Sequence, residues 1–231
     1  MSLDRLRVDE AVHALRPDFA VLALAVSGLT NGPGDAQSER WLQEAEVHAR
    51  AGGGALVPAH VVSWQAAYRA FGAKPQRTAS SVEALWRRAV GPGLPRLNWL
   101  VDLYNAVSVR HGLPVGGEDL RAFVGPIRLV RATGAETFDT MKDGLPANDP
   151  PSPGEVVWAD DHGVTCRRWN WRQGTRTRLT EHSTSVLFLL ERLDPMPLDA
   201  LDAAGDALLA MIRARTPNAA VARVRLGPGV S

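Results

Sequence analysis

The chain has 231 residues, of which 45% are hydrophobic, so it is long enough to bury a substantial core. Its formal net charge of +1 does not by itself indicate a protein that binds nucleic acid. A single cysteine, Cys166, excludes an intramolecular disulfide, and without Cys/His pairs at ligand spacing no structural zinc site is expected.

The start of the chain, "MSLDRLRVDE", has no apolar run after a basic residue and therefore predicts no secretory signal. The longest apolar stretch, Phe19 to Val26, has eight residues, which is too short to cross a bilayer. We therefore expect a cytoplasmic protein with no membrane attachment, no metal and no cofactor. No stable protein partner is evident.

The N-terminal half is predicted to be mainly helical after one buried strand over 18–27. The expected helices are 36–50 with Asp35 as N-cap, one that begins after Pro58, one that begins at Ser80 or Ser81 and ends at "GPG", and one between Asn98 and Gly112.

Beyond this point the hydrophobic period changes toward two, which is typical of strands. The expected strands are 126–132, 155–160, 163–169, 175–180 and 183–193, with "DDHG" and "RQG" as tight turns, followed by a helix over 198–215 and a strand over 220–226. The pattern predicts a mixed α/β (α+β) layered fold with mixed sheets, in which helices are concentrated in the N-terminal half. We expect residues 1–231 to form a single domain.

Most familiar catalytic motifs are absent from the sequence, including G-x-S-x-G, the phosphate-binding G-K-[ST] loop and H-E-x-x-H. Cys166 follows His162 by four residues and suggests a nucleophile pair. A hairpin with "DDHG" at its turn would instead bury the cysteine and expose the histidine, and we favour that interpretation.

The helix after Asn98 carries a polar seam between two apolar flanks. Asn98, Asp102 and Asn105 fall at i, i+4 and i+7 and share one face. They can support a binding site through hydrogen bonds, with one of them touching a ligand, or they can simply cap the helix and bridge buried carbonyls.

The segment "CRRWNWRQGTRTR" interleaves cations with indoles. Such a pattern is typical of binding to a single-stranded RNA end, because arginine grips phosphates and indole stacks on an unpaired base. The alternative is a solvated hairpin whose tryptophans pack inward. The candidate RNA-binding residues are Arg167, Arg168, Trp169, Trp171, Arg172 and Arg176.

Three ordered segments, "RAFGAKPQRTASSVEALWRRAV", "NWLVDLYNAVSVRHGLPVGGEDL" and "WADDHGVTCRRWNWRQGTRTRLTEHSTSVLFLLE", resemble the B3/B4 domain, strongest over 64–193. This module forms the editing part of the phenylalanyl-tRNA synthetase beta subunit and also occurs as small standalone proteins, which the chain resembles more closely. The resemblance implies a three-layer α/β fold and hydrolysis of the ester that joins a wrong amino acid to tRNA. One standalone branch removes canavanine, an arginine mimic, from arginine tRNA.

One departure from the synthetase pattern concerns the pocket. Where the synthetase domain has a pocket histidine after its "G-x-P" turn, this chain has Gly116. We interpret the change as a different side-chain specificity. Gly116 and Gly117 are then expected to form a glycine turn whose N–H groups face the substrate, with Asn98, Asp102 and Asn105 hydrogen-bonding that turn from below.

The remaining candidate residues are expected after the glycine turn, at the end of the predicted strand 155–160 and next to the long apolar strand 183–193. Carboxylates can pair with an α-ammonium or a guanidinium-like group, and His182 or Glu181 can orient the attacking water. The candidate substrate-binding residues are Glu118, Asp119, Asp160, Thr180 and Thr184.

The leading hypothesis is a trans-editing aminoacyl-tRNA deacylase whose partner is the aminoacylated end of tRNA. Two alternatives stay open: a noncatalytic module that binds tRNA or an amino acid, and a hydrolase of small-molecule esters or amides.

Overall fold

The computed structural model describes residues 3–54 and 56–228. Its helices are α1 (Glu10–Leu15), α2 (Ala36–Arg50), α3 (Leu56–Ala70), α4 (Ser81–Val90), α5 (Trp99–His111), the 3-10 helix η1 (Leu120–Ala122) and α6 (Leu198–Arg215). Its strands are β1 (Leu6–Val8), β2 (Ala20–Ser27), β3 (Val115–Asp119), β4 (Ile127–Arg131), β5 (Asp139–Lys142), β6 (Leu145–Asn148), β7 (Val156–Ala159), β8 (Val164–Arg167), β9 (Arg172–Gln173), β10 (Ser185–Arg192) and β11 (Ala220–Leu226).

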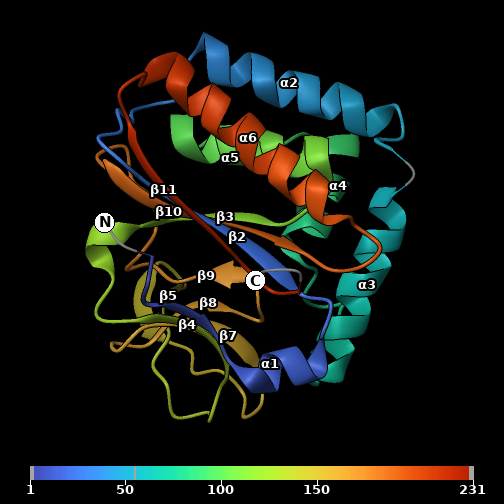
Figure 1. Ribbon diagram of the computed structural model, residues 1–231, viewed down its shortest axis with the longest axis vertical. Coiled ribbons are helices and arrows are strands. Elements are labelled where there is room, and N and C mark those ends of the chain that lie inside the picture. The colour runs from blue at the N-terminus through green and yellow to red at the C-terminus, as the bar shows by residue number, and fades with distance from the viewer. Residues whose placement is uncertain (1–2, 55, 229–231) are drawn as a thin grey trace.

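The elements form three layers, as Figure 1 shows. Helices α5 and α6 cover one face of a four-stranded sheet with the order β11-β2-β10-β3, and α2 packs on α5. The other face of this sheet packs on a five-stranded sheet with the order β1-β4-β7-β8-β9. The expected mixed α/β layered fold, with most helices in the N-terminal half, is confirmed.

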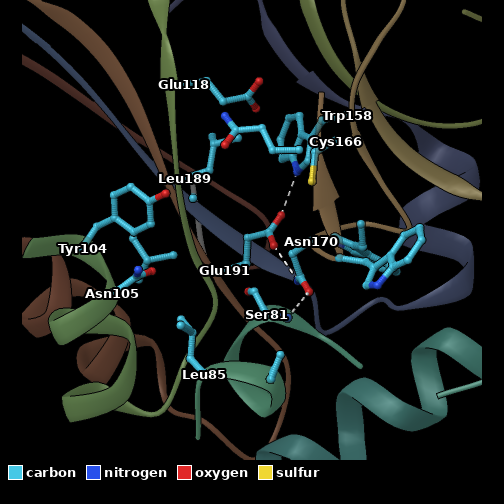
Figure 2. Close-up of a pocket in the computed structure, with 16 residues that line it drawn as sticks. Ser81, Leu85, Tyr104, Asn105, Glu118, Trp158, Cys166, Asn170, Leu189 and Glu191 are labelled. Atoms are coloured by element: carbon cyan, nitrogen blue, oxygen red, sulfur yellow. Dashed lines mark hydrogen bonds between the residues drawn. The ribbon is translucent and has the colours of Figure 1, made fainter. Parts of the chain in front are cut away.

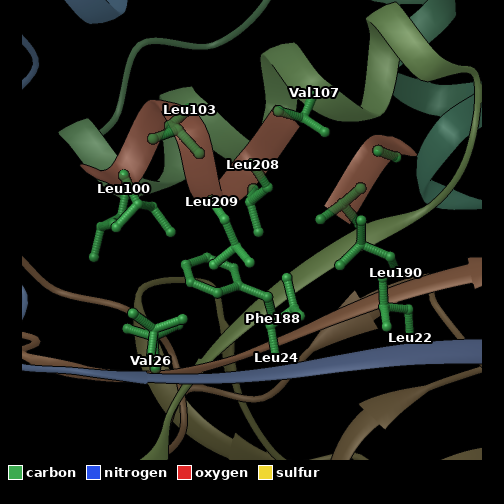
Figure 3. Packing of buried hydrophobic residues seen from close by; sticks show 14 of the residues in the cluster. Leu22, Leu24, Val26, Leu100, Leu103, Val107, Phe188, Leu190, Leu208 and Leu209 are labelled. Carbon is green, nitrogen blue, oxygen red and sulfur yellow. The ribbon is translucent and has the colours of Figure 1, made fainter. Parts of the chain in front are cut away.

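Strands β2 and β10 pair antiparallel through the centre of the molecule and are buried on both faces. Because side chains alternate along a strand, each strand supplies two apolar layers. Figure 3 shows the layer under the helices, where Leu24 and Phe188 meet Leu103 of α5 and Leu208 of α6. The opposite layer, which includes Leu187 and Leu189, faces the five-stranded sheet.

Local signals fixed several helix ends. Asp35 accepts hydrogen bonds from the backbone of Gln37 and Ser38 at the start of α2. Asn98 caps α5, which ends at Gly112 in the left-handed conformation, as expected. Helix α3 begins at Leu56, two residues before Pro58, because proline is accommodated in the first turn of a helix.

Three predictions in the second half were wrong. Residues 175–180 are a loop held by side chains, with a single bridge between Arg178 and Glu118. The turn between β8 and β9 lies at 168–171, so that Gln173 is in a strand. Gly116 and Gly117 belong to β3 and pair with β10, so they do not form a turn.

No helix within the described residues is both long enough and apolar enough to span a bilayer.

The side chain of His60 connects three parts of the fold. Its Nδ1 lies 2.8 Å from the Gly112 carbonyl oxygen, and its Nε2 accepts from Trp64 Nε1 (3.0 Å) and from the Leu193 backbone N–H (3.1 Å). Burial lowers the pKa of His60 to about 4, so the neutral ring with its proton on Nδ1 satisfies all three contacts.

We expect His60→Leu to destabilise the fold by roughly 3 kcal/mol, because three buried polar groups lose their partner. In a chain of this size the melting temperature should fall by about 6–12 °C. Thermal unfolding followed by circular dichroism measures this. His162→Leu, a change at an exposed turn, is the matched control and should leave the melting temperature nearly unchanged. Equal melting temperatures for the two variants would contradict the assigned role of His60.

Candidate functional site

A cavity of about 250 Å³ lies between the two sheets, bounded by β3, β10, the β7–β9 strands, the first half of α4 and the middle of α5 (Figure 2). Its volume suits an amino-acid-sized group rather than a dinucleotide. Apolar and aromatic side chains supply most of its wall, and two carboxyl groups, those of Glu118 and Glu191, project into it.

The register of β3 and β10 explains why these two carboxyl groups share one cavity. On β10, Leu187, Leu189 and Glu191 alternate with residues that face the helices, so all three face the second sheet. In the antiparallel pairing Gly116 lies opposite Leu189 and Glu118 lies opposite Leu187. Gly116 and Glu118 therefore face the cavity together with Glu191.

Glu191 is held rigidly by two neutral donors. The side chain is 2% exposed, and its oxygens accept from Trp158 Nε1 and Asn170 Nδ2, both at 2.8 Å. Within residues 3–54 and 56–228 it makes no ion pair. Burial raises the pKa of Glu191 to about 8, because the two hydrogen bonds only partly offset the desolvation of a charged carboxylate.

Glu118 has a similar environment. Its oxygens accept from Thr177 Oγ1 (2.6 Å) and Thr165 Oγ1 (3.3 Å). Burial raises the pKa of Glu118 to about 7, although both hydrogen bonds and the more distant Arg176 favour its charged form. Like Glu191, it makes no ion pair in the part of the chain that the structure describes.

Two buried carboxyl groups without a counter-ion are costly for a fold and are therefore informative. Such a cavity favours a bound cation, either an ammonium or a guanidinium group, which would lower both pKa values. Near neutral pH a carboxyl group with a pKa of about 7 can also accept a proton from water.

Asn170 links the carboxyl groups to the start of α4. Its Oδ1 accepts from the Tyr68 hydroxyl at 2.9 Å and from the Ser81 backbone N–H at 3.4 Å, while its Nδ2 donates to Glu191. The hydroxyl of Ser81, which lines the cavity, is buried and finds no hydrogen-bond partner among the described residues. This unsatisfied hydroxyl group lies close to Glu191 in the wall of the cavity (Figure 2).

Gly116 leaves space in the cavity. A Cβ atom added at this position would meet no other atom within 4 Å, whereas one added at Gly117 would lie 3.0 Å from Tyr104 and Leu179. The two glycines thus face opposite sides of β3, and the Gly117 carbonyl accepts from Gln173 Nε2 at 2.8 Å. They do not form the expected turn of free N–H donors.

The polar seam of α5 does not act as the predicted support for the glycines. Asn98 accepts from the Val101 N–H, and Asp102 accepts from the Leu97 N–H at 2.8 Å and from Ser38 at 3.5 Å. Helix α2 packs on α5, so Asp102 serves the α2–α5 contact, whereas Asn98 caps α5 and also accepts from Asn31 Nδ2 at 3.3 Å. Asn105 is the one of the three that lines the cavity.

Asp119 lies on the other side of β3 from Glu118, because one step along a strand reverses the side chain. It accepts from Ser183 Oγ at 2.8 Å and pairs with Arg121. The four neighbouring candidates, Thr180, Glu181, His182 and Thr184, are exposed and do not line the cavity.

Asp160 also lies outside the cavity and has a structural environment. It is 4% exposed, pairs with Arg176 at 2.8 Å and accepts from three backbone N–H groups. Burial alone would raise the pKa of Asp160, but these hydrogen bonds lower it below its usual value. The ion pair also removes Arg176 from the free cations of the predicted RNA-binding hairpin.

The remaining hairpin residues separate into buried and exposed groups. Arg167 is 3% exposed and pairs with Glu155 at 2.8 Å, so it is not available to a ligand, and Trp169 is fully buried against the cavity. Trp171 lies between the guanidinium groups of Arg168 and Arg172, at 4.3 and 4.4 Å from its ring centre. Among the predicted cations Arg167, Arg168, Arg172 and Arg176, Arg172 is the exposed one.

Sequence reasoning missed several cavity residues, namely Ser81, Tyr104, Trp158, Asn170 and Glu191. A signal for Glu191 was present, since it is a lone carboxylate at the end of the apolar run "SVLFLL" and in phase with Leu187 and Leu189. The others depend on how the two sheets pack, which no local pattern encodes.

We expect Glu191→Gln to change how stability depends on pH. The folded-state pKa of about 8 lies above the usual 4.5, so the favourable contribution of the protonated group is complete below pH 4.5 and lost as the pH rises through 8. Relative to wild type, the variant should gain about 3 °C or more in melting temperature between pH 5 and pH 9, which is the shift for roughly 1 kcal/mol. Glu44→Gln, an exposed carboxyl group on α2, should show no such trend. If the difference in melting temperature between Glu191→Gln and wild type stayed constant from pH 5 to pH 9, the raised pKa of Glu191 would be ruled out.

Comparison with known proteins identifies the family. No curated protein sequence matches this chain. An N-terminal fragment of the phenylalanyl-tRNA synthetase beta-subunit from Pyrococcus horikoshii is structurally similar, with a TM-score of 0.49, 13% identity and coverage of 95% of this chain and 53% of that fragment. The chain thus spans about half of the fragment's length. The profile of the B3/4 domain matches residues 63–211, well over half of the sequence, which confirms the resemblance expected from the motifs. The chain belongs to the B3/4 domain family.

Proposed function

We propose that this protein is a trans-editing aminoacyl-tRNA deacylase of the cytoplasm, which hydrolyses the ester bond between a wrong amino acid and its tRNA. Its membership of the B3/4 domain family supports a tRNA-related role, because the synthetase module that it resembles performs editing. The observation that carries the proposal is the cavity between the sheets, with two buried carboxyl groups that no cation neutralises among the described residues.

In the proposed reaction, Glu118 acts as the general base. It accepts a proton from a water molecule as the water oxygen attacks the carbonyl carbon of the ester, and its pKa of about 7 suits this step. The hydroxyl of Ser81 donates to the carbonyl oxygen as negative charge develops on it. The bond to the ribose oxygen then breaks, that oxygen takes the proton that Glu118 accepted from water, and the free amino acid leaves while Glu118 returns to its carboxylate form.

In the same proposal, Glu191 selects the amino acid. Its two oxygens are fixed by Trp158 and Asn170 and keep lone pairs available for a cationic group of the substrate. The open space over Gly116 leaves room for a long side chain. This combination favours an arginine mimic, and canavanyl-tRNA(Arg) is the substrate that we propose.

The direct test is amino-acid release from purified canavanyl-, arginyl-, phenylalanyl- and tyrosyl-tRNA at low enzyme concentration. We expect fast release from the canavanyl species and rates near spontaneous hydrolysis for the neutral ones. Fast release from a neutral species alone would keep the deacylase and reject the cationic specificity. No release from any of them, together with tight tRNA binding, would favour the noncatalytic module.

Glu118→Gln tests the proposed base. Because general-base catalysis contributes about 10²–10⁴-fold, kcat/KM should fall by that factor while the acid limb of its pH profile, near pH 7 in wild type, disappears. Glu44→Gln controls for the loss of a carboxyl group and should keep wild-type kinetics. A variant Glu118→Gln with an unchanged pH profile would exclude Glu118 as the base.

A further inference from the structure

A second cavity, of about 240 Å³, lies beside the loop that joins α3 to α4, and three cations line it. Lys74 and Arg77 come from this loop, and Arg168 comes from the turn between β8 and β9. Thr78 and Ser152 add hydroxyl groups to the wall. The wall is therefore rich in hydrogen-bond donors.

The positive charge of this cavity is only partly compensated. Lys74 and Arg77 are exposed, and neither has an ion-pair partner in the described ranges 3–54 and 56–228. Glu155, the one carboxylate in the wall, is held by Arg167 at 2.8 Å and lies 3.6 Å from Arg168. The wall thus holds three cations and one carboxylate, and a buried arginine already neutralises that carboxylate.

Local contacts hold the lining cations in place. The backbone N–H groups of Arg77 and Thr78 donate to the Lys74 carbonyl at 2.9 and 3.0 Å, and the Thr78 hydroxyl donates to the same oxygen at 3.2 Å. This closed turn holds Lys74 and Arg77 on one side of the cavity. On the other side, stacking on Trp171 at 4.3 Å orients the guanidinium of Arg168.

The two cavities are close neighbours in the fold. Thr78 lines the second cavity and Ser81 the first, so at most about 11 Å of chain separates them. Arg168 and Trp169 are consecutive residues that line the second and first cavities respectively. A ligand whose end occupies the first cavity can therefore place a neighbouring group in the second.

We propose that the second cavity binds a backbone phosphate of the RNA whose aminoacylated end occupies the first cavity. This inference rests on the proposed function and names a contact surface for it. A phosphodiester suits the wall, because arginine donates to phosphate in a planar fork while lysine acts as a point charge. The donors come from the α3–α4 loop as well as from the β8–β9 turn, so the proposed phosphate site extends beyond the predicted RNA-binding hairpin.

The first experiment measures binding of uncharged tRNA to the full chain as a function of salt, for wild type, K74E/R77E and K142E. Lys142 is the other lysine of the chain and lies exposed on β5, outside the lining of the cavity, so K142E is a charge reversal elsewhere on the surface, with half the net-charge change of K74E/R77E. We expect K74E/R77E to weaken binding roughly tenfold or more, and to make the slope of log K against log salt shallower by about 0.7, because the contact with one phosphate is lost. K142E should keep the wild-type slope, and unchanged melting temperatures should show that all variants fold.

A second readout separates this inference from the deacylase proposal. K74E/R77E should raise KM for aminoacyl-tRNA and leave the hydrolysis of an aminoacyl methyl ester unchanged. If the wild-type protein hydrolyses neither substrate but its tRNA binding depends on Lys74 and Arg77, the deacylase proposal is wrong and the proposed phosphate site is supported. Equal slopes for K74E/R77E and K142E would overturn the phosphate site, as would loss of inorganic phosphate binding in K74E/R77E without any loss of tRNA affinity.

Discussion

The pairing of β2 with β10 is the constraint on which the rest of the structure depends. Both strands are buried on both faces, so the two apolar cores of the molecule meet along one pair of strands. The seven apolar residues of β2, Ala20 to Val26, have no polar alternation because neither face reaches water. β10 also carries β3 on its free edge, and the register of that pair sets which residues of β3 face the second sheet.

The cavity interrupts the apolar packing between the two sheets. Period-two alternation on β10 leads from Leu187 and Leu189 to Glu191, so a carboxyl group takes the position of a core residue. Glu118 does the same on the neighbouring strand. Proteins tolerate a charged residue in an apolar environment mainly at functional sites, and here two such residues line the same cavity. The unfavourable burial of these two carboxyl groups thus identifies the candidate site without any comparison with related proteins.

Local sequence signals predicted most of the helices and strands but did not predict the full set of residues that line the cavity. The Asp35 cap, the Gly112 terminator and the apolar period of α6 placed three helices closely, because each signal acts within a few residues. Residues 175–180 alternate like a strand, yet contacts from Arg176 to Asp160 and from Thr177 to Glu118 hold them as a loop. Glu118, Gly116 and Asn105 were predicted near the substrate and line the cavity, whereas Asp119 and His182 do not. The difference lies in strand direction and sheet packing, which are set by residues far away in the chain.

Position 116 has a consequence for how such a pocket evolves. The main chain of this residue is held by the ladder to β10, its φ lies outside the left-handed region, and space is open where a side chain would project. Side chains of different sizes can therefore occupy the position while the fold keeps its contacts. Related lineages can change the depth of the pocket by one substitution at little cost in stability, and a new specificity does not have to wait for compensating changes elsewhere.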